Sequence, residues 1–161
     1  MIDYRNWQIS LGRRFRSLKI WFVMRSYGLS GMKAYIRKGL TLGNIFADKV
    51  RSRPDLFEIV TPPAFALTVL RIRNPASQKK EEDGQNPAVP QVDETANALT
   101  KSVFELINKR GQIYITSTVI AGIYAIRVVS ANPLAGEPYV LRAFDILVAT
   151  TEEVLKENAR A

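Results

Sequence analysis

The apolar positions of this chain follow two different periods. In Trp7–Arg53 they recur every three or four residues, which is the spacing of one face of an α-helix. The pattern predicts a first helix over about Arg13–Tyr27 that stops at Gly28. A longer helix is expected over about Ser30–Ser52, ended by Pro54.

After Pro54 the period changes to that of β-strands. Strands are predicted at Phe57–Val60 and Ala66–Ile72, joined by a turn around Pro62-Pro63. Two further strands are predicted at Ile113–Ser117 and Gly122–Val129.

Helices separate and follow these strand pairs. Asp93 is expected to cap a helix that Gly111 ends, and Glu137–Asn158 carries a second helical pattern. In the long N-terminal helix, Gly39 and Gly43 fall on one face, which favours close packing against another element. This order of elements predicts an α+β fold with a mostly antiparallel sheet and helices on one face.

The distribution of charge changes near Pro54, where the spacing of the apolar residues also changes. Residues 1–53 hold 12 Lys and Arg against 2 Asp and Glu, whereas the remainder holds 11 against 13. We therefore predict a basic helical segment at 1–53 and a small C-terminal α+β domain at 54–161. Residues 74–92, with three prolines and a run of charges, are expected to form a flexible loop or insertion.

The absence of two residue types excludes several kinds of catalytic and metal site. The chain contains no histidine and no cysteine. This argues against His-based acid–base catalysis, Ser-His-Asp and Cys-His sites, most zinc sites and disulfides. No apolar run approaches the roughly 18 residues that could span a bilayer, and the N-terminus lacks the features of a signal peptide. We expect a cytoplasmic protein with no resident metal and no membrane partner.

The amino-acid sequences of two segments are similar to those of one enzyme family. Asp3–Gly28, D-Y-R-N-W-Q-I-S-L-G-R-R-F-R-S-L-K-I-W-F-V-M-R-S-Y-G, resembles the aromatic-L-amino-acid decarboxylases, which depend on pyridoxal 5′-phosphate (PLP). Ile123–Pro133 and the helix after it resemble the last strand and helix of the same family. Ser10 stands where family members often have proline, and residues 74–92 resemble the family poorly.

The resemblance implies a carboxy-lyase whose PLP accepts the electrons left when CO₂ departs from an amino acid. It also implies a homodimer, in which residues 1–53 are the tail of the large PLP-binding domain and the helix that leaves it. The family's Schiff-base lysine follows a histidine in the large domain, and no such pair occurs in these 161 residues. We therefore expect the chain to be a C-terminal fragment or truncated product that is inactive alone.

Three positions are candidates for contact with cofactor, substrate or partner. A glycine just before a helix suits an anion at the helix N-terminus, although it can equally form a plain tight turn. The resemblance implies that Gly12 approaches the PLP phosphate across the dimer interface, and that Arg5 lies near the interface and the catalytic loop. It also implies that Arg127 contacts the substrate carboxylate, and the alternative is an internal ion pair with Asp145 or Glu137.

Two non-catalytic functions remain as alternatives. The basic helices could bind an acidic surface, but no nucleic-acid-binding motif is present, so nucleic acid is not expected as a partner. The chain could also act as a dimerisation module that pairs with full-length subunits.

Overall fold

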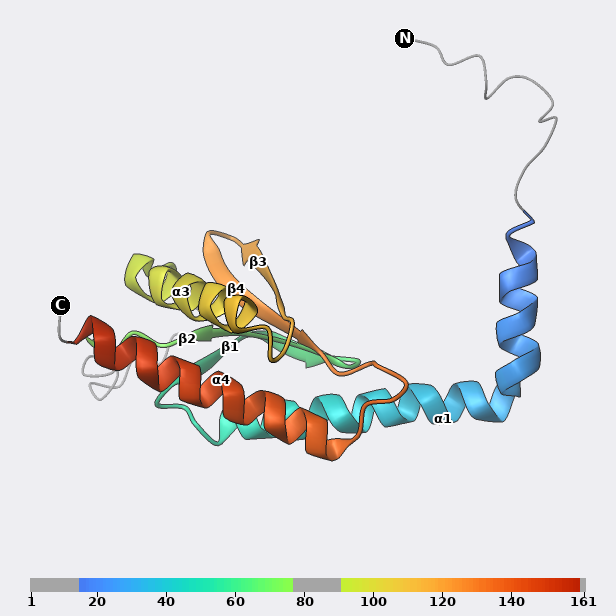
Figure 1. Cartoon of the computed structure of the whole chain (residues 1–161). Coiled ribbons are helices and arrows are strands. Elements are labelled where there is room, and N and C mark those ends of the chain that lie inside the picture. The colour runs from blue at the N-terminus through green and yellow to red at the C-terminus, as the bar shows by residue number, and fades with distance from the viewer. Residues whose placement is uncertain (1–14, 77–90, 160–161) are drawn as a thin grey trace, which may run out of the picture. The chain divides into compact units, whose positions relative to one another are not determined.

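The computed structural model describes residues 15–76 and 91–159. Three long helices and four strands follow one another along the chain (Figure 1). In order they are α1 (Ser17–Arg51), β1 (Phe57–Ala64), β2 (Leu67–Ile72), α3 (Glu94–Arg110), β3 (Thr116–Ile120), β4 (Ile123–Val129) and α4 (Glu137–Asn158).

All strand pairs are antiparallel, and the sheet has the order β1-β2-β4-β3. The predicted α+β class with an antiparallel sheet is confirmed. The chain divides into two compact units, Met1–Tyr35 and Ile36–Ala161. The division predicted between residues 53 and 54 stays a prediction, and most of the predicted 74–92 loop lies outside the described residues.

In α1, Gly28 interrupts regular helical geometry, with a φ of 63° and a ψ of 178°. A side chain rarely adopts this conformation, so glycine is the natural residue for the predicted break. The predicted helix start near Arg13 lies outside the described residues. Before the break, large apolar side chains such as Trp21, Phe22 and Met24 are exposed.

The turn predicted at Pro62-Pro63 is wrong. Both prolines lie within β1, and the turn falls instead at Phe65-Ala66, where Phe65 has a φ of 54°. Proline lacks the N–H that a central strand needs, but β1 is an edge strand. The register with β2 shifts between Thr61 and Ala64, which accommodates the prolines.

The third strand was predicted three residues too early. It covers Thr116–Ile120 instead of Ile113–Ser117. Its end is fixed by a two-residue turn at Ala121-Gly122, where φ is 49° and 82°. Positive φ at both turn residues matches the twist of the flanking strands, so this turn determines the register of the hairpin.

The three helices pack on one face of the sheet. Their buried residues form a single apolar cluster with residues of β1, β2 and β4. Within this cluster, Phe144 of α4 makes ring contacts with Phe46 of α1 and Phe57 of β1. The last part of α1, from Leu42 to Val50, is therefore part of the core of the second unit.

Gly43 allows the closest approach between α1 and the sheet. A Cβ at this position would lie 2.9 Å from the Cα of Ala66 and 3.0 Å from the carbonyl oxygen of Phe65. At Gly39, one turn earlier, the same test gives an ordinary contact of 3.6 Å with the Cβ of Ala66. Of the two glycines predicted to allow close packing, Gly43 is therefore the one at which a side chain does not fit.

Candidate functional site

Arg127 lies in the middle of the sheet but its side chain is exposed. It borders an open cavity of about 400 Å³ on the second unit. The cavity combines an apolar wall that includes Phe46 with a rim that includes Tyr114 and Tyr139. One cation beside two exposed tyrosines could receive the carboxylate of an aromatic molecule.

The internal ion pair considered for Arg127 does not form within the described part of the chain. Neither Asp145 nor Glu137 lies within ion-pair distance of its guanidinium there. Because the side chain is exposed, its charge needs no buried partner. The contact with a substrate carboxylate stays a prediction.

The other two candidates, Gly12 and Arg5, lie outside the described residues. Whether Gly12 begins a helix or forms a turn is therefore not addressed by the structure. Its predicted contact with the PLP phosphate, and the predicted place of Arg5 near a subunit interface, both stay predictions.

The lysines allow a test of whether this part of the chain can hold PLP covalently. A Schiff-base lysine sits in an enclosed site that lowers its pKa and excludes water. Every lysine in residues 15–76 and 91–159 is exposed. The described residues therefore do not fit the role of the Schiff-base lysine, and no catalytic step is assigned to them.

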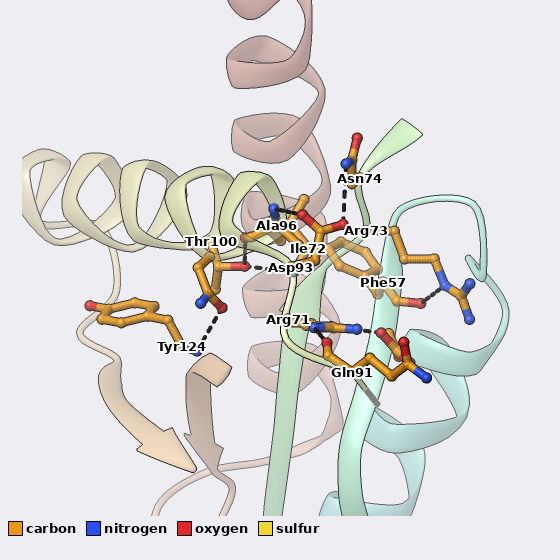
Figure 2. Close-up of polar contacts among 12 residues, drawn as sticks. Phe57, Arg71, Ile72, Arg73, Asn74, Gln91, Asp93, Ala96, Thr100 and Tyr124 are labelled. Carbon is orange, nitrogen blue, oxygen red and sulfur yellow. Dashed lines mark hydrogen bonds and ion pairs between the residues drawn. The ribbon is translucent and has the colours of Figure 1, made fainter. Parts of the chain in front are cut away.

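A buried arginine that the sequence analysis did not single out is Arg71 on β2. Its side chain is only 9% exposed and binds the Glu58 carboxylate at 2.6 Å. It also donates to the carbonyl oxygen of Gln91 at 2.6 Å (Figure 2). The clue in the sequence was a lone arginine in the apolar run of residues 66–72. With both charges paired, the arrangement ties β1, β2 and the entry to α3 together.

Polar side chains cap the start of α3 and fasten it to the sheet, and Figure 2 shows Asp93 and Thr100 among them. The Asp93 carboxylate accepts from the Ala96 N–H at 3.0 Å, which confirms the predicted cap. Thr100 accepts from the Ile72 N–H at 3.0 Å and donates to the Ala96 carbonyl at 2.6 Å. Asn97 accepts from the Tyr124 N–H at 2.8 Å. The Asp93 contact satisfies a helix N–H and the contacts of Thr100 and Asn97 satisfy strand N–H groups, so all three are structural.

Arg53 connects the end of α1 with α4. Its guanidinium donates three hydrogen bonds to the Asp55 carboxylate, the shortest at 2.9 Å, and one to the Glu152 carboxylate at 3.1 Å. The hydrogen bond with Asp55, and then that with Glu152, raise the pKa of the Arg53 guanidinium. The same hydrogen bond from Arg53 lowers the pKa of the Asp55 carboxyl. The cluster is partly exposed to solvent, and we assign it a positioning role and not a chemical one.

The described ranges hold no cluster of three or more residues with metal-binding side chains. None of the described helices is long and apolar enough to cross a membrane.

Several known proteins similar to this chain are plant decarboxylases. A family profile described as "Pyridoxal-dependent decarboxylase conserved domain" matches residues 1–73. The aromatic-L-amino-acid decarboxylase of Catharanthus roseus is 34% identical over 157 residues, which cover 98% of this chain and 28% of that protein. Tyrosine/DOPA decarboxylase 2 of Papaver somniferum is 34% identical over 170 residues, covering 100% of this chain and 32% of that protein.

The fold agrees with the sequence matches. The crystal structure of Oryza sativa TDC with PLP superposes with a TM-score of 0.74 at 35% identity, covering 94% of this chain and 30% of that one. These findings define the class as the group II PLP-dependent decarboxylases. Within that class, the chain corresponds to the C-terminal portion of an aromatic amino acid decarboxylase of the tyrosine, DOPA or tryptophan type. It spans 28% to 32% of the length of these relatives.

Proposed function

We propose that this chain supplies the C-terminal portion of a PLP-dependent carboxy-lyase that converts an aromatic L-amino acid to its amine and CO₂. The observation that carries the proposal is the extent of the match. Identity of 34% to the Catharanthus roseus decarboxylase runs over 98% of the chain, through both the helical segment and the α+β domain. A module that shared only a fold would not be expected to keep such identity along its whole length.

In such an enzyme, PLP supplies the electron sink for decarboxylation when it is bound. The second unit would contribute a rigid scaffold, with Arg127 and its neighbouring tyrosines facing solvent at one end. We expect the Schiff-base lysine to come from the part of these enzymes that the 161 residues do not match. We also propose that this enzyme is a homodimer and that its substrate is tyrosine, DOPA or tryptophan.

The 161-residue chain, produced alone, is expected to make no amine. The physical reason is that its described lysines are all exposed and none lies in a Schiff-base setting. Purified chain would be incubated with PLP and tyrosine, tryptophan or L-DOPA, and amine formation would be compared with that of free PLP. Turnover above the rate with free PLP would show that the chain carries a complete site of its own.

Gly12 is proposed to approach the PLP phosphate in the complete enzyme. A side chain there would push the backbone N–H away from the phosphate, and losing one charge-assisted hydrogen bond costs about 1.5–3 kcal/mol. In a full-length enzyme that carries this segment, Gly12→Val should weaken PLP binding by about 10- to 150-fold. Arg16→Gln, which removes an exposed charge just before α1, serves as the control.

The measurement is a PLP titration of the apo enzyme beside a thermal melt. If Gly12 forms only a tight turn, the Gly12→Val variant should lose stability while its PLP dissociation constant stays unchanged. That result in a folded dimer would refute the phosphate contact.

A further inference from the structure

The two edges of the sheet differ in how well they are protected against pairing. β1 forms one edge and carries Pro62 and Pro63 together with two register shifts. Prolines and irregularities of this kind prevent another strand from adding to an edge. β3 forms the other edge and reads Thr-Ser-Thr-Val-Ile, with no proline and no charge. Its residues favour the extended conformation, so this edge has no such protection.

The turn determines which backbone groups of β3 point outward. Ala121 and Gly122 form a two-residue loop with positive φ at both positions, and Ile120 and Ile123 are register partners on either side of it. In a two-residue hairpin loop this flanking pair is the hydrogen-bonded one. In an antiparallel ladder, hydrogen-bonded and non-hydrogen-bonded pairs alternate. The N–H and C=O groups of Val119 and Ser117 therefore point away from β4.

A hydrogen bond on the opposite strand supports this assignment. Tyr124 is the register partner of Val119, and its N–H donates to the side chain of Asn97 at 2.8 Å. The Tyr124 N–H is thus directed away from Val119, as a non-hydrogen-bonded pair requires.

The open stretch of this edge is short and well defined. Next to it, Ile115 is already satisfied, because the Asn108 side chain binds both its N–H and its C=O at 3.1 Å. The outward backbone groups of Ser117 and Val119 have no hydrogen-bond partner within the described residues. The Val119 side chain is 63% exposed, and α3 packs over β2 and β4. Four backbone hydrogen-bonding groups are thus left open at this edge.

We propose that this edge pairs with β3 of a second copy of the chain. The two open residues lie on either side of Thr118, so a two-fold axis at Thr118 places Ser117 of each copy opposite Val119 of the other. Each of these two pairs can exchange two backbone hydrogen bonds, which satisfies all four open groups of each strand. The result is a continuous sheet of eight strands, four from each copy.

A second copy is the occupant that this edge fits best. Its register is self-complementary, it brings no like charges together within the paired strands, and it sets two threonines side by side at the axis. The inference does not depend on the decarboxylase function proposed above, since it rests only on the geometry of the β3 edge.

The first test uses the absence of cysteine from the chain. In the proposed dimer, Thr118 of one copy lies directly opposite Thr118 of the other, with Cα atoms about 4.5 Å apart, within reach of a disulfide. Thr116 of one copy lies opposite Ile120 of the other, so the two Thr116 residues are too far apart. Under mild oxidation, Thr118→Cys should therefore form a covalent dimer at least roughly tenfold faster than Thr116→Cys. Equal cross-linking of the two variants would indicate another surface and overturn the proposal.

The second test does not depend on a cysteine. Val119→Pro removes an N–H that points outward, so it should leave the hairpin folded while abolishing the dimer. Val119→Thr keeps that N–H and the β-branched shape, and should keep the dimer. Sedimentation of the 161-residue chain and both variants, with circular dichroism to check folding, measures this. A monomeric parent chain would overturn the proposal and leave another protein as the partner of this edge. A dimer that survives in folded Val119→Pro would also overturn it, because the two copies would then pair through another surface.

Discussion

At Gly43, the backbone of α1 lies so close to the turn between β1 and β2 that a side chain does not fit. An added Cβ would meet the Ala66 Cα at 2.9 Å and the Phe65 carbonyl oxygen at 3.0 Å, and both belong to the backbone. Gly43→Ala should therefore destabilise the fold by about 1–3 kcal/mol, as other overpacked sites do. Thermal or urea unfolding of the purified variant measures the change.

Gly39→Ala is the matched control on the same helix. Its Cβ would make an ordinary 3.6 Å contact with Ala66, and alanine in place of a helical glycine favours the helix by up to about 1 kcal/mol. This variant should be neutral or more stable than the parent. If both variants lose the same stability, the close contact at Gly43 is not what requires glycine there.

At the scale of elements, one hydroxyl group forms a buried hydrogen bond between α3 and β2, in addition to their apolar packing. Thr100 is fully buried, and its oxygen is the acceptor for the Ile72 N–H. Thr100→Val keeps the shape but leaves that buried N–H unpaired, which should cost about 1–3 kcal/mol of unfolding free energy. Denaturant unfolding would measure the loss.

Thr151 provides the comparison, because it is equally buried but only donates, to the Leu147 carbonyl within its own helix. Thr151→Val leaves no N–H unpaired and should change stability by much less than Thr100→Val. Equal losses would mean that the lost polar group itself matters more than the orphaned backbone N–H.

Elements governed by local chemistry were predictable, and those governed by tertiary position were not. The sequence alone predicts the Asp93 cap, the left-handed Gly111 and the bounds of α4, because each depends on neighbours within a few residues. Pro62-Pro63 was misread as a turn, since only the edge position of β1 makes prolines acceptable in a strand. The start of β3 was misplaced because the Ala121-Gly122 turn determines its register.

The candidate site was predictable only through resemblance. Spacing and composition gave a helix-start glycine and a lone strand arginine, neither of which identifies a ligand by itself. The exposure of Arg127 could not be read from an apolar strand pattern, because it depends on where the cavity opens beside the sheet. The structural role of Asn97 likewise depends on a contact with Tyr124, which lies 27 residues further along the chain.

At the scale of the whole molecule, the second unit has a complete core, whereas the segment before it does not cover its own apolar residues. Phe15, Trp21, Phe22 and Met24 are each more than half exposed. Apolar groups of this size are normally covered by another surface. The arrangement is consistent with a chain that functions as one portion of a larger enzyme, which is the central claim of the proposed function.

A chimeric enzyme tests that claim most directly. The portion of the Catharanthus roseus decarboxylase that matches this chain would be replaced by the 161 residues, and amine formation from tryptophan, tyrosine and L-DOPA would be measured. The account predicts a PLP-loaded enzyme that decarboxylates at least one of them with a kcat/KM within about a hundredfold of the parent, a loss of up to about 2.7 kcal/mol. A folded chimera that binds PLP but forms no amine from any of the three would contradict it.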